Sequence, residues 1–341
     1  MKILYVGTAQ GFLNADKLHL TPQKLIQGFT RNGHCVYPFN DKEYARYSNI
    51  WRSSRRGIRQ ANEKLIDVCH QMYPDLIVLG HCKHIANETL DEIRTFLPDI
   101  KIIYRNVDPL HSKPNVRDIH QRVGVVDGIF ITTAGEDLKQ FSHAKTFVCH
   151  MPNMVDPSVE TGRAFETDGI HDFFFAGSVL RDQYDQRQDV LQLIQEECGD
   201  LRLGIYGANQ GQEKLFGHRY LDTLAQSKMG LCINKTSDYY LYSSGRMTQY
   251  MGQGLLIFHD RGARFEDIFG EDEIGFYDSP EELVDKIRYY HDHDDERRKI
   301  AKAGWEKAHR IFNNQTVTKY IIERTFDKPL SQDYVWSTDV Y

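Results

Sequence analysis

The sequence lacks several features that would assign it to a specialised class of protein. No apolar run approaches the roughly 20 residues that span a bilayer, and the opening MKILYVG indicates a buried strand rather than a signal peptide. The 42 Lys and Arg against 48 Asp and Glu give a net charge of −6, which offers no general basic field for nucleic acid. We therefore expect a cytoplasmic globular protein with no integral membrane segment and no nucleic-acid partner.

Cysteine pairs with the spacing of metal or redox sites are also absent. The six cysteines are scattered without a CxxC pair, and four lie in or beside predicted strands, as small core residues do. This pattern favours a reducing compartment and excludes disulfides and structural zinc. The run His291 to Asp295 (HDHDD) has the chemistry of metal ligands, but it lies between two predicted helices, where Asp caps the second. We expect no metal site.

The chain of 341 residues is long enough for two domains. Apolar strand-like runs alternate with helical patterns from Lys2 to His150, and the alternation restarts at His171. Between them, Pro152 to Gly169 contains two Pro, two Gly and several acidic residues, which is typical of an interdomain linker. Alternation of this kind predicts βαβ units and parallel sheets. We expect an α/β fold of two doubly wound, Rossmann-like domains that face each other across a cleft.

Ligands of doubly wound sheets bind at the carboxyl ends of the strands, where the strand order reverses. In the first half, His81 follows an apolar strand and is a candidate general base, although a histidine satisfied by the backbone is equally common there. Asp108 ends the next strand and is a candidate for accepting a hydroxyl proton. An Asx turn before Pro109 explains Asp108 equally well.

In the second half, the strand ending at Gly177-Ser178 offers backbone amides to a pyrophosphate, and Arg181 adds charge nearby. The full glycine pattern of a dinucleotide site is missing, so a tight strand–helix turn is an equal alternative. Tyr206 and Lys235 lie at two further strand ends. Because no DxD-like pair lies at a strand end, we expect Arg, Lys and helix dipoles, rather than a divalent cation, to neutralise a bound phosphate.

The most informative stretch is SSGRMTQYMGQGLLIFHD, from Ser243 to Asp260. Its spacing predicts a helix capped by Ser243 or Ser244, with one apolar face and a neighbouring polar face, followed by a buried strand. The predicted polar face contains Arg246, Gln249 and Gln253. An Arg at the positive end of a helix suits a phosphate-bearing ligand, whereas the plain alternative is a surface helix with a solvated Arg.

Residues 242–312 resemble the carboxy-terminal domain of spore-maturation-protein-type glycosyltransferases, a branch of the GT-B superfamily. The matching stretches are SSGRMTQYMGQGLLIFHD and FEDIFGEDEIGFYDSPEELVDKIRYYHDHDDERRKIAKAGWEKAHRIF. The first half is similar to the family only in pattern. The resemblance implies transfer of a sugar from a nucleotide-sugar donor to an acceptor hydroxyl. We expect the acceptor to be a glycan or surface polysaccharide and, because no DxD-like pair is found, the transfer to be metal-independent.

In related enzymes, a motif Arg-x-x-Glu with a Gly five residues later follows the Ser-rich helix start, and its Glu contacts the donor ribose. Arg246 and Gly254 match this motif, but Gln249 replaces the Glu. A Gln still hydrogen-bonds a ribose hydroxyl, without charge assistance. From the resemblance and the strand-end positions together, we expect the donor nucleotide to be bound by Gly177, Ser178, Arg181, Tyr206, Lys235, Ser244, Gly245, Arg246 and Gln249.

The resemblance also implies a division of labour along the chain. Residues 1–153 would bind the acceptor, residues 170–315 the nucleotide-sugar, and residues 316–341 would form a helix crossing back to the first domain and a tail. Arg246 would stabilise the departing phosphate, while Asp108 or His81 would manage the acceptor proton. The nucleotide-sugar is a co-substrate, so no separate cofactor is expected. A nucleotide-sugar epimerase of the same fold, a non-catalytic two-lobed sugar-binding protein and an inactive transferase stay open as alternatives.

Overall fold

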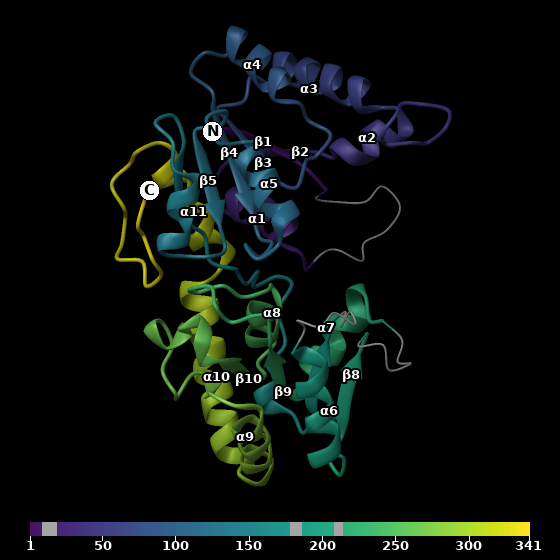
Figure 1. Ribbon diagram of the computed structural model, residues 1–341, viewed down its shortest axis with the longest axis vertical. Coiled ribbons are helices and arrows are strands. Elements are labelled where there is room, and N and C mark those ends of the chain that lie inside the picture. The colour runs from purple at the N-terminus through teal and green to yellow at the C-terminus, as the bar shows by residue number, and fades with distance from the viewer. Residues whose placement is uncertain (9–18, 178–185, 208–213) are drawn as a thin grey trace. The chain divides into compact units, whose positions relative to one another are not determined.

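The computed structural model describes residues 1–8, 19–177, 186–207 and 214–341 (Figure 1). The chain divides into two compact units. Unit 1 consists of residues 1–152 together with 314–341, and unit 2 consists of residues 153–313. Ser178 and Arg181, two of the expected donor-binding residues, lie outside the described residues.

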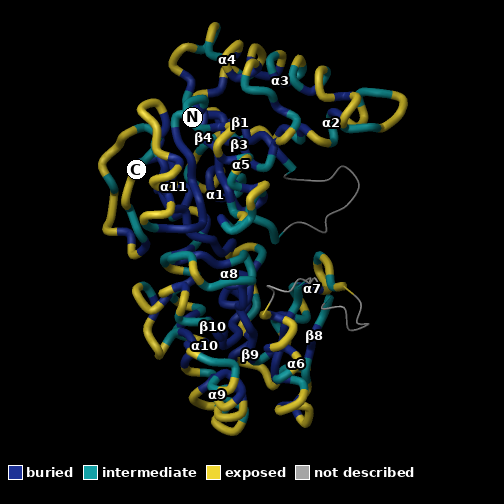
Figure 2. Tube along the Cα trace, viewed as in Figure 1, coloured by how far each residue is buried: buried dark blue, intermediate teal, exposed yellow. Residues whose placement is uncertain are grey.

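Unit 1 is built on a parallel sheet of six strands in the order β2-β1-β3-β4-β5-β6. Strands β3 and β5 are continuous apolar runs, as expected where helices cover both faces of a sheet, and Figure 2 shows them buried. The strands are β1 (Lys2–Val6), β2 (Cys35–Phe39), β3 (Leu76–Leu79), β4 (Lys101–Asn106), β5 (Gly128–Ile131) and β6 (Phe147–His150).

The helices of unit 1 include the helix that closes the fold from the far end of the sequence. They are α1 (Thr21–Arg31), α2 (Asp41–Tyr47), α3 (Ile58–Met72), α4 (Asn87–Phe96), α5 (Lys113–His120), the 3₁₀ turn η1 (Glu136–Phe141) and α11 (Asn314–Thr325). Helix α11 packs on α1, where Arg31 Nη1 donates to Asn314 Oδ1 (2.7 Å). A β-carbon on Gly28 would stand 2.3 Å from the carbonyl oxygen of Asn314, so only glycine permits this close packing.

Unit 2 holds a parallel sheet of five strands in the order β11-β10-β9-β7-β8. The strands are β7 (His171–Ala176), β8 (Leu203–Tyr206), β9 (Ser227–Cys232), β10 (Leu256–Asp260) and β11 (Gly275–Tyr277). The helices are α6 (Arg187–Glu197), α7 (Gly217–Ala225), α8 (Arg246–Gly252), α9 (Pro280–Asp292) and α10 (Asp294–Ile311), with 3₁₀ turns η2 (Ala164–Glu166), η3 (Arg261–Ala263) and η4 (Phe265–Asp267). The predicted α/β class, with doubly wound parallel sheets, is confirmed.

The stretch expected as a linker packs onto unit 2 instead. Ala164 and Phe165 are buried, and Val155 forms a parallel bridge with Asn313 at the other end of the unit. The backbone N–H of Val155 donates to the carbonyl of Phe312 (2.9 Å). The first and last residues of unit 2 therefore lie side by side, and the Pro and Gly of this stretch shape a fixed irregular segment rather than a loose connection.

The helix predicted at the start of the stretch from Ser243 to Asp260 is shorter than the sequence predicts. Helix α8 begins at Arg246, and no side chain caps it. The predicted serine cap is wrong because the Ser244 hydroxyl accepts from Arg246 Nε (3.1 Å) instead. Gln253, expected on a polar face, is buried, and its Oε1 accepts from the backbone N–H of Gly162 (2.5 Å). The helix is consequently embedded on nearly all sides rather than half-solvated.

The structure also bears on the state of the cysteines and on membrane-spanning helices. All six cysteines are unpaired, and only Cys35 is exposed. Throughout the described ranges, no helix combines the length and the apolar character that crossing a membrane requires.

Candidate functional site

The switch point of the unit 2 sheet lies between β7 and β9, because the chain passes from β7 to β8 on one side and then to β9 on the other. Arg246 lies at this point. Its Nη2 donates to the carbonyl of Ile233, directly after β9 (3.0 Å), and its guanidinium carbon lies 5.0 Å from the centre of the Phe175 ring on β7. The motif within residues 243–260 predicted a cation at a ligand site. In the structure, Arg246 lies at the switch point, where doubly wound sheets bind their ligands.

One nitrogen of this guanidinium is left over. Nη1 of Arg246 is buried and has no hydrogen-bond partner among the described residues. A β-carbon on Gly177 would stand 3.3 Å from Nη1, so the nitrogen lies against the end of β7. A buried N–H group without a partner costs about 1–3 kcal/mol, and more when it is charged. Charge-assisted bonding to an anionic oxygen would recover that cost.

Two asparagines hold Arg246 in place. Nδ2 of Asn234 donates to the carbonyl of Tyr242 (3.0 Å), and its Oδ1 accepts from the N–H of Ser244 (3.3 Å). Asn153 Nδ2 donates to the carbonyl of Ser243 (2.8 Å). These bonds close the segment that leads from β9 to α8, so the guanidinium is aimed by buried side chains rather than by a loose loop. Sequence reasoning did not find Asn153, which is distant along the chain.

Gln249 lies one turn along α8 and is buried. Its Oε1 accepts from the Tyr220 hydroxyl (2.7 Å), and burial holds the pKa of that phenol well above its usual value, which keeps it a donor. The amide nitrogen of Gln249 lies near Gly245, 3.6 Å from where a β-carbon on that glycine would stand. Gln249 and Gly245 therefore gather with Arg246 and Gly177, and Tyr220 is a supporting residue that the sequence did not reveal.

The remaining expected donor residues lie differently. The backbone N–H of Gly177 donates to the carbonyl of Tyr206 (3.1 Å), so this amide is not available to a pyrophosphate. The Tyr206 hydroxyl pairs with Nε2 of His171 (3.0 Å), at the start of β7, and thus points away from the carboxyl edge. Lys235 is half-buried directly after Asn234. Ser244 contributes by orienting Arg246.

The switch point of the unit 1 sheet lies between β1 and β3, and His81 follows β3. Nε2 of His81 lies 3.8 Å from Oδ2 of Asp108, so the structure brings together the two candidates for proton transfer. Burial lowers the pKa of His81, the charge of Arg105 lowers it further, and Asp108 opposes both. At neutral pH the imidazole is therefore uncharged and able to accept a proton.

Arg105 is the residue of this site that sequence reasoning missed. Only 3% of it is exposed, and its Nε and Nη2 donate to the Tyr5 hydroxyl (3.2 and 2.8 Å). Within the described residues, its Nη1 has no partner. The available signal was an Arg inside the otherwise apolar run of β4, because a charge in a buried strand needs a reason.

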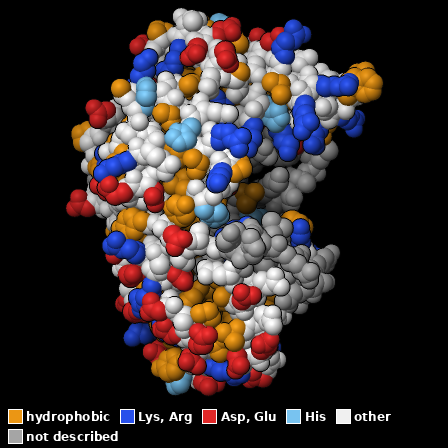
Figure 3. Space-filling model, viewed as in Figure 1, with side chains coloured by type: hydrophobic (Ala, Val, Ile, Leu, Met, Phe, Trp, Pro, Cys, Tyr) orange, Lys and Arg blue, Asp and Glu red, His pale blue; other side chains and the backbone are white. Residues whose placement is uncertain are grey.

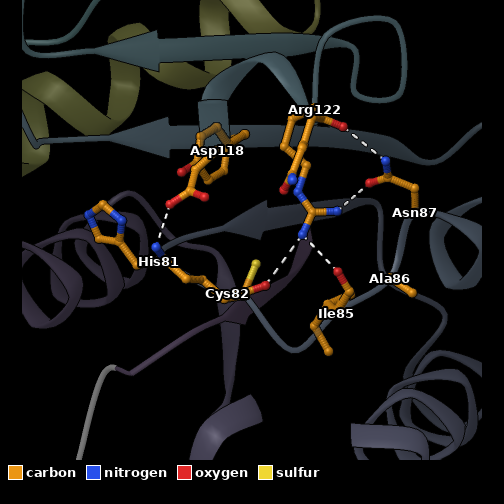
Figure 4. A pocket seen from close by; sticks show the side chains of 10 residues that line it. His81, Cys82, Ile85, Ala86, Asn87, Asp118 and Arg122 are labelled. Carbon is orange, nitrogen blue, oxygen red and sulfur yellow. Dashed lines mark hydrogen bonds and ion pairs between the residues drawn. The ribbon is translucent and has the colours of Figure 1, made fainter. Parts of the chain in front are cut away.

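A pocket of about 340 Å³ opens beside His81 within unit 1 (Figure 4). Figure 4 shows the Arg122 guanidinium reaching the carbonyls of Cys82 and Ile85, and its Nη2 donates to the latter at 2.8 Å. On the other wall, Lys83 pairs with Asp118 (2.5 Å). The pocket thus combines fixed hydrogen-bonding groups with a neutral imidazole at its rim, a combination that suits a hydroxyl-bearing ligand.

The run His291 to Asp295 does not form a metal site. His293 stacks on Tyr289, with ring centres 4.1 Å apart, and Asp294 pairs with Arg297 (2.7 Å). Nor does any other part of the described chain bring together three or more His, Cys, Asp or Glu as metal ligands.

Comparisons with known proteins agree with this architecture. Residues 186–323 match a family model described as glycosyl transferase-like. Among solved structures, Alr3699/HepE of Anabaena in complex with UDP-glucose is 12% identical, with a TM-score of 0.61 over 96% of this chain and 100% of that one. The complex of the same protein with UDP and glucose is 14% identical, with a TM-score of 0.59 over the same shares of the two chains.

Two further solved structures extend the likeness. Sucrose-phosphate synthase of Thermosynechococcus elongatus is 11% identical, with a TM-score of 0.58 over 96% of this chain and 98% of that one. AviGT4, a glycosyltransferase of avilamycin A biosynthesis, is 12% identical, with a TM-score of 0.55 over 95% and 97%. No curated protein sequence matches the chain. The predicted GT-B fold and the glycosyltransferase resemblance are confirmed, whereas the spore-maturation branch is not.

Proposed function

We propose that this chain, which has the GT-B fold and a glycosyl transferase-like region over residues 186–323, transfers a sugar from a nucleotide-sugar donor to an acceptor hydroxyl. The observation that carries the proposal is the buried, unpartnered Nη1 of Arg246 at the switch point of unit 2, as judged from the described residues. An anionic oxygen of the leaving nucleotide supplies the missing partner. This role needs no divalent cation.

The donor contacts follow from the cluster in unit 2. Arg246 binds the diphosphate and stabilises the negative charge that grows as the sugar–phosphate bond breaks; one such contact is worth roughly 3–4 kcal/mol. Gln249 lies beside it for a ribose hydroxyl. Because HepE was solved with UDP and with UDP-glucose, we take UDP-glucose as the first donor to test.

The acceptor chemistry falls to unit 1. The acceptor oxygen forms the new bond to the sugar carbon, the bond from that carbon to the diphosphate breaks, and the acceptor proton passes to Nε2 of His81. Asp108, 3.8 Å from that nitrogen, stabilises the imidazolium that results. The neighbouring pocket holds the acceptor, for which we propose a glycan hydroxyl, and a cytoplasmic location is part of the same proposal.

Calorimetry with UDP, ADP and GDP tests the donor site directly. Arg246→Ala should weaken binding of the preferred nucleotide by at least tenfold and cut transfer by about 10²–10³-fold. The matched control is Arg264→Ala in the same unit, which removes an exposed partner of Asp267 (2.8 Å) and should leave both unchanged. Equal affinities of wild type and Arg246→Ala would remove this residue from the site.

Incubation with the donor alone separates the proposal from its rivals. A transferase consumes UDP-glucose efficiently only when an acceptor is added, whereas an epimerase releases an epimer or free sugar without one. Binding of bare glucose with no affinity for any nucleotide would favour a non-catalytic sugar-binding protein. Either of these two results would overturn the proposal.

A further inference from the structure

The segment between α2 and α3 carries bulky apolar side chains that the fold leaves in solvent. We name residues 46–59 the arginine loop. Ile50 is 90% exposed, the highest value of any large apolar side chain in the described chain, and Trp51 is 67% exposed. Tyr47 and Ile58 flank them at 42% and 39%. Each such side chain forgoes part of the free energy that burial of apolar surface provides, so their grouping at one site needs an explanation.

The same segment concentrates positive charge. Six exposed cationic side chains occur within residues 41–59: Lys42, Arg46, Arg52, Arg55, Arg56 and Arg59. The two carboxylates of this range are engaged, since Asp41 is buried against His84 (3.0 Å) and Glu43 accepts from Asn40 (3.0 Å). Residues 41–59 therefore carry a net +4 in a chain whose net charge is −6. Figure 3 shows apolar side chains at the tip beyond α2, with basic side chains beside them.

The arginine loop is held in one shape. Asn49 Nδ2 donates to the carbonyls of Ala45 (2.8 Å) and Ser53 (2.9 Å), and its Oδ1 accepts from the N–H of Ser53 (3.2 Å). The Arg56 guanidinium lies 4.7 Å from the centre of the Trp51 ring. Gly57 packs so closely on Ala45 that a β-carbon would stand 1.8 Å from its carbonyl oxygen. These contacts hold the exposed Ile50 and Trp51 in a defined position at the tip of the arginine loop.

An apolar tip with a cationic rim is the pattern of surfaces that enter the interface of a bilayer. Trp and aliphatic side chains bury themselves at the level of the headgroups, while Arg contacts the anionic lipids. A merely solvated loop would need the arginines but not the exposed Ile50 and Trp51. A soluble polyanion would engage the arginines and leave Ile50 in water. The combination therefore favours a lipid surface over both.

We propose that the arginine loop docks unit 1 onto the surface of an anionic phospholipid bilayer, as a peripheral contact. The proposal goes beyond sugar transfer and does not depend on it. The bond between Asp41 and His84 (3.0 Å) ties the start of α2, the helix that leads into the arginine loop, to the loop that carries His81.

Co-sedimentation of the full chain with vesicles tests the proposal. Wild type should bind vesicles of phosphatidylcholine with phosphatidylglycerol and should not bind phosphatidylcholine alone. Arg55→Gln with Arg56→Gln should weaken binding by about 30-fold, since each basic residue near an anionic surface contributes about 1 kcal/mol. Ile50→Ser with Trp51→Ser should weaken it further and make the residual binding sensitive to salt.

Matched controls separate the loop from general charge and general exposure. Lys113→Gln with Arg117→Gln removes two exposed charges from α5, and Tyr37→Ser removes an aromatic side chain that is 51% exposed. Both variants should bind the anionic vesicles like wild type. Variants of the loop should keep the nucleotide affinity and melting temperature of wild type, because the loop lies outside the core.

Tryptophan emission gives a second readout. Of the three tryptophans, Trp336 is 2% exposed, and Trp305 is half-buried with its indole N–H donating to the carbonyl of Gly162 (3.0 Å), so a blue shift on adding vesicles reports mainly on Trp51. Trp51→Phe should remove the shift but retain binding. Absence of wild-type binding to anionic vesicles at low salt would overturn the proposal. Equal losses in the α5 control would do so too, as would binding of a soluble polyanion such as heparin with no emission shift on vesicles.

Discussion

The two sheets carry different kinds of side chain at their switch points, the places where the strand order reverses. In unit 2, Arg246 is enclosed by Phe175, Ile233 and Ser244, and only one nitrogen lacks a partner within the described residues. In unit 1, His81 and Asp108 keep 31% and 56% of their side chains exposed and lie 3.8 Å apart, although Nε2 of His81 itself is buried. A half-buried cation that two hydrogen bonds hold in place suits recognition of an invariant anionic group. A partly exposed pair suits proton exchange with acceptors that come and go.

The largest expected effect comes from variants that remove the His81–Asp108 pair. His81→Gln and Asp108→Asn should each lower transfer by about 10²–10⁴-fold, because the acceptor proton loses its receiver or the imidazolium its counter-charge. Calorimetry should show an unchanged nucleotide affinity, the reverse of the result expected for Arg246→Ala. The control is His70→Gln, an exposed histidine on α3. A lost nucleotide affinity in His81→Gln would contradict the division of roles.

A second test exchanges two asparagines that support the two sites. Asn234 fixes the segment before Arg246, and Asn106 accepts from the N–H of Asp108 (3.1 Å) while pairing with Asn115 (2.6 Å). Each change to Ala should destabilise its unit by about 1–3 kcal/mol, because buried polar partners are orphaned.

The functional losses of these two variants should differ in kind. Asn234→Ala should raise the KM for the donor about tenfold, by loosening the Arg246 contact, whereas Asn106→Ala should lower kcat and leave donor binding unchanged. Asn313→Ala provides a control, since this side chain donates to the carbonyls of His309 and Arg310 (3.0 Å each), which lie outside both sites. If Asn106→Ala changed KM for the donor alone, Asp108 would have no separate role.

A smaller difference concerns acid. Burial lowers the pKa of His150 in unit 1 to about 3, far below 6.5, so the folded unit stays uncharged there while the unfolded chain takes up a proton. The free energy of unfolding of unit 1 is therefore unaffected by His150 above pH 6.5. It decreases as the pH falls toward 3, by about 1.4 kcal/mol per pH unit. In unit 2, burial raises the pKa of Asp172, but hydrogen bonds and charges from Arg202 and Lys228 outweigh burial and lower it below 3.8. That contribution is lost only as the pH falls below 3.8.

Urea unfolding followed by tryptophan emission checks this ordering. With Trp305 replaced by Phe, the remaining tryptophans, Trp51 and the buried Trp336, both report on unit 1; with Trp51 and Trp336 replaced by Phe instead, Trp305 reports on unit 2. Unit 1 should weaken first as the solution is acidified, and His150→Gln should flatten its pH dependence. An identical pH dependence in both units, or one that His150→Gln does not alter, would contradict the assignment.

How much could be predicted from sequence depended on whether the signal was local. Alternating apolar runs predicted both parallel sheets, and a continuous motif located Arg246. Arg105, Asn153 and Tyr220 were missed because each acts on a partner far away along the chain, such as Tyr5 or Ser243. No periodicity records such a pairing. The sheet of unit 1 was visible, but its pocket was not, since its walls come from separate loops.

The errors also have physical causes. Ser243 or Ser244 was predicted to cap α8, but neither does, and the hydroxyl of Ser244 accepts from the neighbouring guanidinium, which is the stronger donor. Gln253 was predicted on a polar face of the helix, but the supposed linker folds over it, and the Gly162 N–H donates to its side chain. In both cases the polar side chain forms a hydrogen bond to a partner other than the one that its local sequence position predicts. Sequence spacing alone does not reveal such a partner.

The parallel bridge between Val155 and Asn313 makes unit 2 a self-contained cassette. Its two ends meet, so the segment 153–313 can be excised or transplanted at a single seam, and residues 152 and 314 can be rejoined by a short graft without unravelling either sheet. Recombination between related genes could therefore replace unit 2 in one piece while unit 1, including its terminal helix, is inherited intact.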